Sequence, residues 1–233
     1  MNEDRIGREF YDRSNYFEAD AGHLIDLDSA FQRYRVAKVL EIYEPRAEER
    51  VLDLGCGWGT FCWALGHRVK EMVGLDFSRR SIDLCEARLP ETGLGNVSFV
   101  CADARATGLE RESFDLVLAA DLVEHLYPED SQAVITEAYR LLKPGGRLSI
   151  WTPNRGHLLE MLKARNIILK RDVSHVDYKS MGRLKSMVES EGFLVEKSYY
   201  AESHIDVLRS LERALIPRVP FLRRRIALLA RKP

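Results

Sequence analysis

The stretch Val51-Leu52-Asp53-Leu54-Gly55-Cys56-Gly57-Trp58-Gly59-Thr60 decides the fold. A short apolar run contains an acid at Asp53, a glycine-rich turn follows, and a helical pattern begins at about Gly59. This order predicts the first strand, loop and helix of a nucleotide-binding α/β domain. Glycine lets the backbone turn sharply and approach a ligand closely, which a Cβ would prevent. The spacing lacks the third glycine of the dinucleotide fingerprint G-x-G-x-x-G, because Thr60 stands at that position.

Three further apolar runs along the chain end in an acid in the same way. They are residues 73–76, 97–103 and 114–121, and their last residues are Asp76, Asp103 and Asp121. An acid after the second strand of such a domain can accept both hydroxyls of a ribose. Four strand ends of this kind in order indicate a nucleotide site more specifically than one glycine loop does.

Five motifs between residues 51 and 150 carry a family resemblance: VLDLGCGWG, VGLDFS, VCADA, FDLVLAADLVEHL and LLKPGGRL. With these motifs the chain resembles the class I S-adenosylmethionine-dependent methyltransferases. It is similar to the small-molecule type found in ubiquinone and menaquinone biosynthesis. The resemblance implies S-adenosyl-L-methionine as the cofactor and S-adenosyl-L-homocysteine as the product. It says little about the substrate.

The alternation of strand and helix patterns predicts a doubly wound α/β fold. The expected sheet is Rossmann-like, mostly parallel and seven-stranded, with an antiparallel final strand. We expect one domain in three parts: a helical cover (1–45), a cofactor-binding core (46–152) and substrate-side insertions with the last strands (153–233). We also expect Pro90 to end a helix that begins near Ser78, and residues 143–146 to separate the next helix from a strand at 147–152.

The resemblance and the strand-end positions together select the residues expected at the cofactor. Asp53 is expected to accept from the cofactor's ammonium, Asp76 from the ribose and Asp103 from the adenine amino group. The complete set of expected cofactor contacts is Asp53, Gly55, Cys56, Gly57, Asp76, Phe77, Asp103, Ala104, Ala120 and Asp121. The alternative for each single acid is a helix cap at a strand–helix loop. Arg33 and Arg35 are expected to be solvated, unless one of them meets the cofactor's carboxylate.

Methyl transfer needs a general base only if the acceptor carries a proton that must leave. Histidine is the natural base near neutral pH, and His125 and His175 are the two candidates. The alternative is that each is a hydrogen-bonded structural histidine. Tyr11, Tyr16 and Tyr178 are expected to contact the acceptor.

The composition limits the kinds of partner and binding site that we expect. A net charge of −1 provides no global field for nucleic acid, so nucleic acid is an unfavoured partner. The four cysteines form no C-x-x-C pair, so we expect reduced thiols, a cytoplasmic protein and no metal site. We expect no signal peptide and no membrane span. The basic, partly apolar stretch 209–232 predicts either a solvated surface or peripheral contact with an anionic membrane. Nothing in the sequence indicates the oligomeric state.

The function expected from these observations is S-adenosylmethionine-dependent methylation of a small or lipophilic acceptor. Oxygen is the favoured accepting atom, and carbon and nitrogen stay open as alternatives. One alternative is a catalytically inactive protein that binds the cofactor and regulates a partner. A second is a nicotinamide-dependent oxidoreductase. A P-loop is excluded because no G-K-[ST] follows the turn.

Overall fold

The computed structural model describes residues 6–13, 29–164, 173–202, 212 and 214–233. Its strands are β1 (Arg50–Leu54), β2 (Glu71–Asp76), β3 (Val97–Cys101), β4 (Phe114–Ala120), β5 (Leu142–Pro153), β6 (Leu194–Ala201) and β7 (Arg225–Arg231). Its α-helices are α1 (Arg8–Arg13), α2 (Ala30–Ile42), α3 (Thr60–Leu65), α4 (Arg79–Thr92), α5 (Pro128–Leu141), α6 (Leu158–Ala164) and α7 (Met181–Ser190). Short 3-10 helices are η3 (Gly66–Arg68), η4 (Val123–His125) and η5 (Pro220–Leu222).

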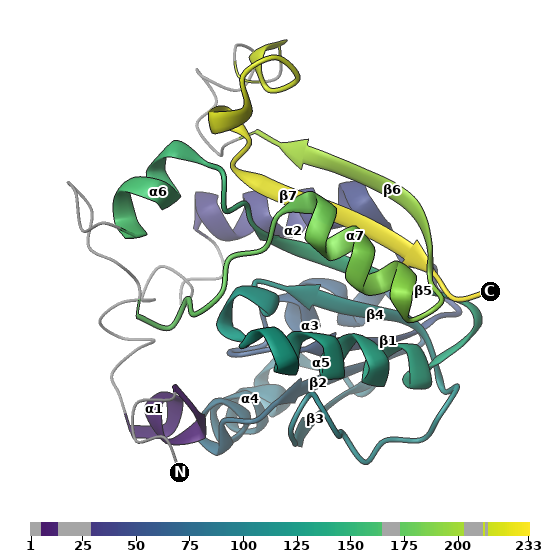
Figure 1. The fold of residues 1–233 in the computed structure, drawn as a ribbon. Helices are drawn as coiled ribbons and strands as arrows, with labels where there is room; N and C mark the ends of the chain where they lie inside the picture. The colour runs from purple at the N-terminus through teal and green to yellow at the C-terminus, as the bar shows by residue number, and fades with distance from the viewer. Residues whose placement is uncertain (1–5, 14–28, 165–172, 203–211, 213) are drawn as a thin grey trace.

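The strands form a seven-stranded sheet in the order β3-β2-β1-β4-β5-β7-β6 (Figure 1). All neighbouring pairs from β3 to β5 are parallel, and β7 is antiparallel to both β5 and β6. The predicted fold class, including the antiparallel final strand, is therefore confirmed. The strand order reverses between β1 and β4, and ligands of open α/β sheets bind at this switch point, beyond the carboxyl ends of the strands.

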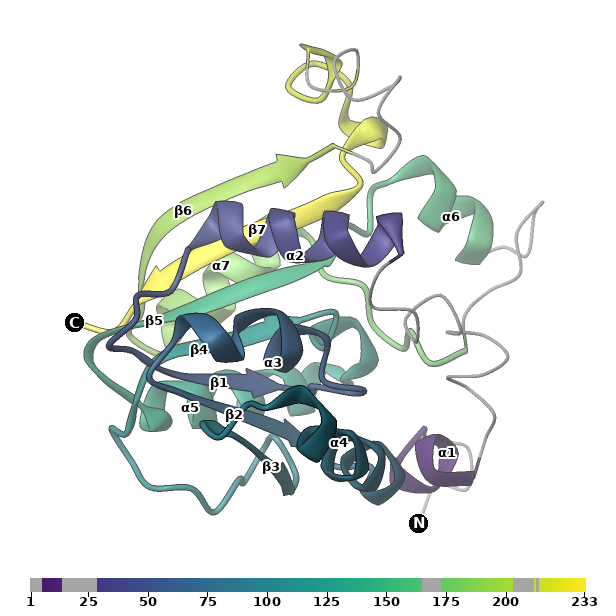
Figure 2. The same cartoon turned by 180° about the vertical axis from the view of Figure 1, so that it is seen from behind.

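Helices cover both faces of the sheet. One face carries α2, α3 and α4 (Figure 2), whose side chains Ile42, Phe61 and Ile82 belong to one buried cluster. The other face carries α5 and α7 (Figure 1), whose Val134 and Leu184 belong to a second buried cluster. Each helix therefore buries one apolar side against the sheet and leaves its loops at the strand ends.

Serine side chains begin three of these helices. The hydroxyls of Ser29, Ser78 and Ser180 accept hydrogen bonds from the backbone N–H three residues later. Such caps satisfy an N–H that would otherwise have no helical partner. Ser78 fixes the beginning of α4 two residues after Asp76, which keeps that acid at the strand end.

Two expected element boundaries were wrong. Helix α4 continues through Pro90 to Thr92, because the proline lies in the last turn, where it costs one helical hydrogen bond; the helix stops at Gly93, with φ of 69°. Residues 143–146 belong to β5, because Leu142 already pairs with Phe114 and the glycines there exchange backbone hydrogen bonds with Lys232.

Gly74 in the buried middle of β2 tests how closely this sheet is packed. A Cβ added there would lie 2.7 Å from the Phe99 ring and 2.8 Å from Cys62 Sγ. We expect Gly74→Ala to lower the free energy of unfolding by about 1–3 kcal/mol in urea titrations. The matched control is Gly182→Ala at an open helical position, where nothing lies within 4 Å of an added Cβ. This control should gain about 0.4–1 kcal/mol, and equal changes in both variants would contradict close packing at Gly74.

Candidate active site

Asp53 lies beneath the turn that follows β1 and is only 1% exposed. Its Oδ2 accepts a weak hydrogen bond from Cys62 Sγ at 3.9 Å, and its Oδ1 has no hydrogen-bond partner among the described residues. Burial raises the pKa of Asp53 to about 7, against the opposing effect of the Arg35 charge. A buried carboxyl with one unused oxygen is suited to a cationic ligand group.

Two glycines shape the turn that follows Asp53. Gly55 and Gly57 have φ of 74° and 52°, a region that side-chain-bearing residues rarely adopt. The N–H groups of Gly55 and Cys56 donate to Leu75 O, which ties the turn to β2. A Cβ on Gly55 would lie 2.8 Å from Leu122 Cδ1, so the loop after β4 packs directly over this turn.

Asp76 connects the same turn to the start of α4. One carboxylate oxygen accepts from Gly57 N and the other from Ser78 N, both at 2.9 Å. Burial raises the pKa of Asp76, while these backbone N–H groups oppose the rise. The acid is therefore held by the backbone with both oxygens at the strand end, as the ribose role requires. It also caps the loop, so the cap alternative and the ribose role are compatible here.

Asp103 and Phe77 flank the position expected for an adenine. The Asp103 carboxylate forms a two-pronged ion pair with Arg105, which lowers its pKa. Arg105 also pairs with Asp130 at 2.8 Å. An adenine amino group at Asp103 would share this carboxylate with Arg105. The Phe77 ring lies 5.3 Å from the Tyr11 ring of α1, so the start of the chain does reach this edge of the sheet.

Asp121 at the end of β4 is held between two arginines. Arg35 of α2 donates to its Oδ2 at 2.8 Å, and Arg225 of β7 donates to its Oδ1. Burial alone would raise the pKa of Asp121, but Arg225 and Arg35 hold it well below the usual range. The expectation of a solvated Arg35 was wrong, because this side chain lies on the buried side of α2.

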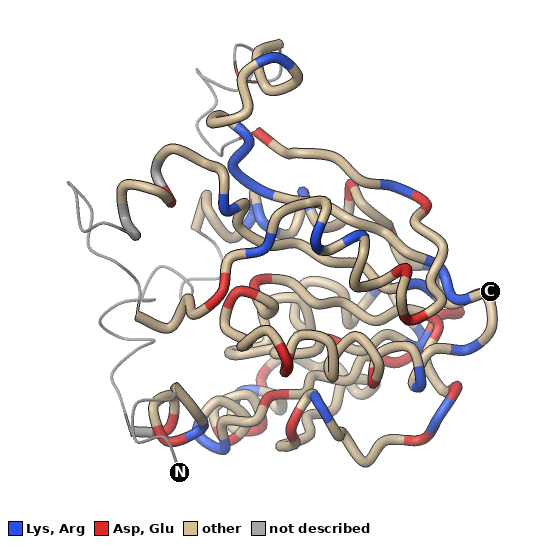
Figure 3. Tube along the Cα trace, viewed as in Figure 1, with Lys and Arg blue, Asp and Glu red and all other residues tan. Residues whose placement is uncertain are grey.

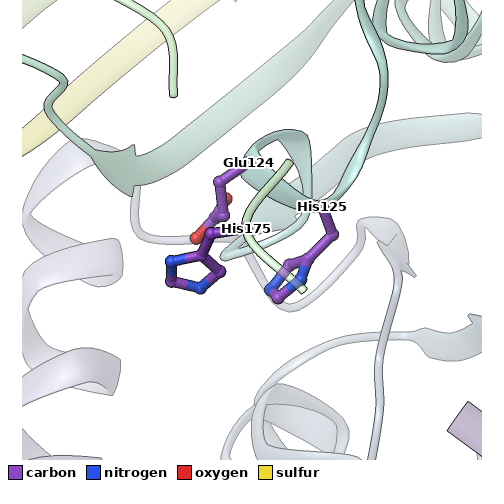
Figure 4. A group of neighbouring side chains, drawn as sticks. All are labelled: Glu124, His125 and His175. Atoms are coloured by element: carbon purple, nitrogen blue, oxygen red, sulfur yellow. The ribbon is translucent and has the colours of Figure 1, made fainter. Parts of the chain in front are cut away.

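Three side chains next to Asp121 form a compact polar cluster (Figure 4). Ligand-type atoms of Glu124, His125 and His175 all lie within 4.8 Å of one another. Glu124 is 1% exposed; its Oε2 accepts from Thr152 Oγ1 at 2.9 Å, and its Oε1 has no partner among the described residues. Burial, followed by the Asp121 charge, raises the pKa of Glu124 to about 8.

Both candidate histidines are anchored by further polar groups. His125 Nδ1 lies 3.1 Å from Tyr11 Oη and 3.2 Å from Ser174 O. His175 Nδ1 lies 2.7 Å from the Oη of Tyr178. Tyr11 and Tyr178 therefore lie beside the predicted bases, as expected of residues near the acceptor. Tyr16 lies outside the described residues. The catalytic, cofactor and substrate roles themselves stay predictions.

Residues 51–146 match the methyltransferase domain family. The segment from β1 into β5 is therefore similar to methyltransferase domains. The matched region begins at β1, contains the glycine turn and the strand-end acids, and ends at Gly146 within β5. The resemblance stated from the sequence motifs is thereby confirmed, together with the fold that it implied.

The chain is also similar in sequence to individual methyltransferases. The chain is 29% identical over 152 residues to the uncharacterized methyltransferase YcgJ of Bacillus subtilis (strain 168), which covers 64% of this chain and 58% of that one. It is 32% identical over 111 residues to a ubiquinone biosynthesis O-methyltransferase of Parvibaculum lavamentivorans, which covers 48% and 43%. The chain thus spans about half the length of these curated relatives.

Solved structures show the same fold. The crystal structure of YcgJ superposes with a TM-score of 0.66 at 20% identity, covering 86% of this chain and 98% of that one. The cyclase SpnF superposes with a TM-score of 0.68 at 19% identity, covering 89% and 84%. These superpositions cover a larger share of this chain than the methyltransferase domain match does.

Sequence reasoning missed three groups that border the site. Glu124 stands beside His125 in the family motif, but its burial and its contact with the later loop carry no local signal. Glu160, which accepts from Tyr178 Oη at 2.9 Å, lies in a segment with mixed apolar and basic character. Arg225 begins the last strand and is followed by five apolar residues. A cation at the edge of such a strand was the one available signal.

Several basic residues near the carboxyl terminus, whose positions Figure 3 marks in blue, have partners inside the domain. Arg225 pairs with Asp121, Arg231 with Glu196, and Lys232 with Glu112. Arg223 donates to the carbonyls of residues 216 and 217. These contacts reduce the charge available to an anionic membrane surface. In the part of the chain that the structure describes, none of the helices has the length and apolar character needed to cross a bilayer.

The pKa of Asp53 predicts a pH-dependent stability. The folded protein holds this proton up to about pH 7, whereas the unfolded chain releases it near the ordinary value of 3.8. Stability therefore falls as pH rises through this window, by up to about 1.4 kcal/mol per pH unit. We expect Asp53→Asn to match the wild type in thermal melts at pH 4 and to exceed it clearly at pH 8. A constant difference between the two proteins at both pH values would contradict the raised pKa.

Proposed function

We propose that this protein transfers the methyl group of S-adenosylmethionine to a hydroxyl oxygen of a small, lipophilic acceptor. The family match supports methyl transfer in general. The name of the ubiquinone O-methyltransferase relatives favours oxygen as the accepting atom and a lipophilic molecule as its carrier. The similarity covers less than half the length of those relatives, so the proposal names a class of acceptor rather than one compound.

The observation that carries the proposal is the buried Asp53 carboxyl with an unused oxygen directly beneath the glycine turn. The cofactor would bring an ammonium group to this position. A charge-assisted hydrogen bond would then satisfy Oδ1 and keep Asp53 ionised. Gly55 and Gly57 have positive φ and carry no side chains, so none would stand between the cofactor and the backbone of the turn. The residues present therefore fit the cofactor.

Other strand ends supply the remaining contacts in this proposal. Asp76 would accept from the ribose hydroxyls with the oxygens that Gly57 N and Ser78 N hold in place. Phe77 would lie against the adenine, with Asp103 and Ala104 at its polar edge. S-adenosylmethionine supplies an activated methyl group on a sulfonium, so the protein has mainly to orient the acceptor and exclude water. Orientation of this kind is worth roughly 7–11 kcal/mol of barrier.

The acceptor would meet the loop after β4. His125 and His175 lie together with their ring centroids 4.7 Å apart, close to Tyr11 and Tyr178. One of the two rings would receive the hydroxyl proton as the methyl group arrives, while the tyrosines border the acceptor. A protein that binds the cofactor without catalysis is the competing proposal, and the histidine variants below distinguish the two.

Cofactor binding is tested by calorimetric titration with S-adenosylmethionine and, in parallel, with reduced nicotinamide cofactors. We expect S-adenosylmethionine alone to bind, and Asp76→Ala to weaken it at least about 100-fold, since two charge-assisted bonds are lost. The matched control is Asp83→Ala on the exposed side of α4, which should bind as the wild type does. Binding that is untouched by Asp76→Ala would refute the cofactor assignment.

The acceptor end is tested by transfer of labelled methyl from S-adenosylmethionine to phenols and catechols with and without lipophilic tails. We expect His125→Ala or His175→Ala to slow turnover by about 100-fold or more while cofactor affinity changes little, because general-base catalysis contributes about this much. His67→Ala, at an exposed position, serves as the control. Small and equal losses in both site variants would remove the general-base role.

A further inference from the structure

We propose that Glu124, His125 and His175 bind one divalent transition-metal ion beside the cofactor site. Their ligand-type atoms lie within 4.8 Å of one another, and they come from two segments that are 50 residues apart in the chain (Figure 4). Two imidazole nitrogens and one carboxylate form the donor set. Donors about 2.0–2.2 Å from a shared tetrahedral ion lie roughly 3.3–3.6 Å apart, so side-chain rotations that bring the ligand atoms closer would complete the site.

The donor types select the class of ion. Imidazole nitrogen suits zinc, iron, nickel and copper, whereas magnesium and calcium take all-oxygen sites. Three protein ligands leave coordination positions open, as catalytic rather than structural sites do. The cluster contains no thiolate, and the nearest sequence signals for a metal, paired cysteines, are absent from the whole sequence. This explains why the cysteine pattern predicted no metal.

The hydrogen bonds behind the histidines set the tautomer that a metal needs. Ser174 O can only accept, so the His125 Nδ1 facing it at 3.2 Å carries the proton. Tyr178 Oη donates to Glu160 Oε2 and therefore accepts from His175 Nδ1. In both neutral rings the lone pair then belongs to Nε2, the nitrogen that binds a metal. Metal-binding histidines typically donate their other N–H to a carbonyl or a similar acceptor in this way.

Glu124 supplies the second, independent observation. The side chain is 1% exposed, and Oε1 has no hydrogen-bond partner among the described residues. Thr152 Oγ1 fixes the other oxygen, Oε2, from the end of β5. A buried acceptor atom without a partner is costly, and native proteins normally satisfy it. A cation shared with the two histidines would satisfy this oxygen.

Positive side chains near the cluster are already engaged. Arg225 pairs with Asp121, which Arg35 also contacts. The ammonium of Lys179 donates to the backbone carbonyls of Val123 and Leu126. These contacts hold the cations in fixed positions and leave the three ligand side chains facing one another.

The location suggests what the ion does, and this step rests on the proposed function. Leu122, next to the cluster, lies over Gly55 of the cofactor turn, and Tyr11 contacts both His125 and Phe77. With the ion bound, neither ring has a lone pair for the acceptor's proton, so the ion would replace the histidine base. An acceptor oxygen on the open side of the ion would lose its proton to water more readily. The oxygen's electron pair would then form the bond to the methyl carbon. The pair of the broken carbon–sulfur bond would stay on sulfur.

The test is a titration of chelator-treated protein with Co²⁺, followed by its visible absorption, because cobalt reports its ligands directly. We expect saturation at one ion per chain for the wild type and for the His67→Ala control. His175→Ala and Glu124→Gln should abolish the bands. Tyr178→Phe should weaken affinity about 10–100-fold, because it removes the acceptor behind His175 without touching a ligand. Circular dichroism checks that each variant is folded.

Saturation by Co²⁺ that is unaffected by His175→Ala would overturn the site, and so would a wild type that takes up no stoichiometric ion. His175→Ala decides the matter if Glu124→Gln does not fold, since His175 lies in a loop rather than in the core. The titration needs no S-adenosylmethionine. Failure of the metal site would therefore leave cofactor binding measurable by calorimetry, and failure of cofactor binding would leave the cobalt spectrum intact.

Discussion

The carboxylate of Asp121 joins three distant parts of the chain at the centre of the sheet. Arg35 reaches it from α2 and Arg225 from β7, while Asp121 itself ends β4. Its backbone adopts a left-handed conformation, with φ of 55°, and its N–H donates to Trp151 O of β5. Breaking such a buried pair by removing one partner costs about 3–5 kcal/mol, because the other charges stay buried. The sharp turn after β4 therefore depends on this ion pair.

The direction of the turn after β4 decides where the residues that follow Asp121 lie. Helix η4 follows, and the carbonyls of Val123 in this helix and of Leu126 just after it accept from the fully buried Lys179. The carbonyl of Glu124 accepts from the N–H groups of Val176 and Asp177. These bonds hold the loop that contains His175 against the loop that contains His125. The meeting of the two histidines is thus a backbone property of the fold, and rotation of single side chains does not create it.

Sequence reasoning placed the acids at the strand ends correctly because its signals are local. Asp53 and Asp76 lie at the ends of apolar runs, and parallel register then brings those ends to one edge of the sheet. The contacts within the polar cluster of Glu124, His125 and His175 have no such local signal. Glu124 and His175 are 51 residues apart, and their contact depends on hydrogen bonds of a loop that has no periodic pattern. Arg35 was misjudged for a related reason, since the partner that makes its burial tolerable lies 86 residues later.

The two sides of the site therefore have different freedom to vary. The cofactor side is built from strand ends and from a glycine turn with positive φ, where most substitutions strain the backbone or remove a buried partner. The acceptor side is built from side chains on loops, anchored by Asp121 and Lys179 but open to different neighbours in α1 and α6. The cyclase SpnF superposes on the same fold. A shared scaffold can keep its strand ends while the groups beside them carry a different chemistry. In this chain those groups are Glu124, whose buried Oε1 has no hydrogen-bond partner among the described residues, and the two histidines His125 and His175, which have the same tautomer. Together they offer a donor set for a cation as well as a pair of bases.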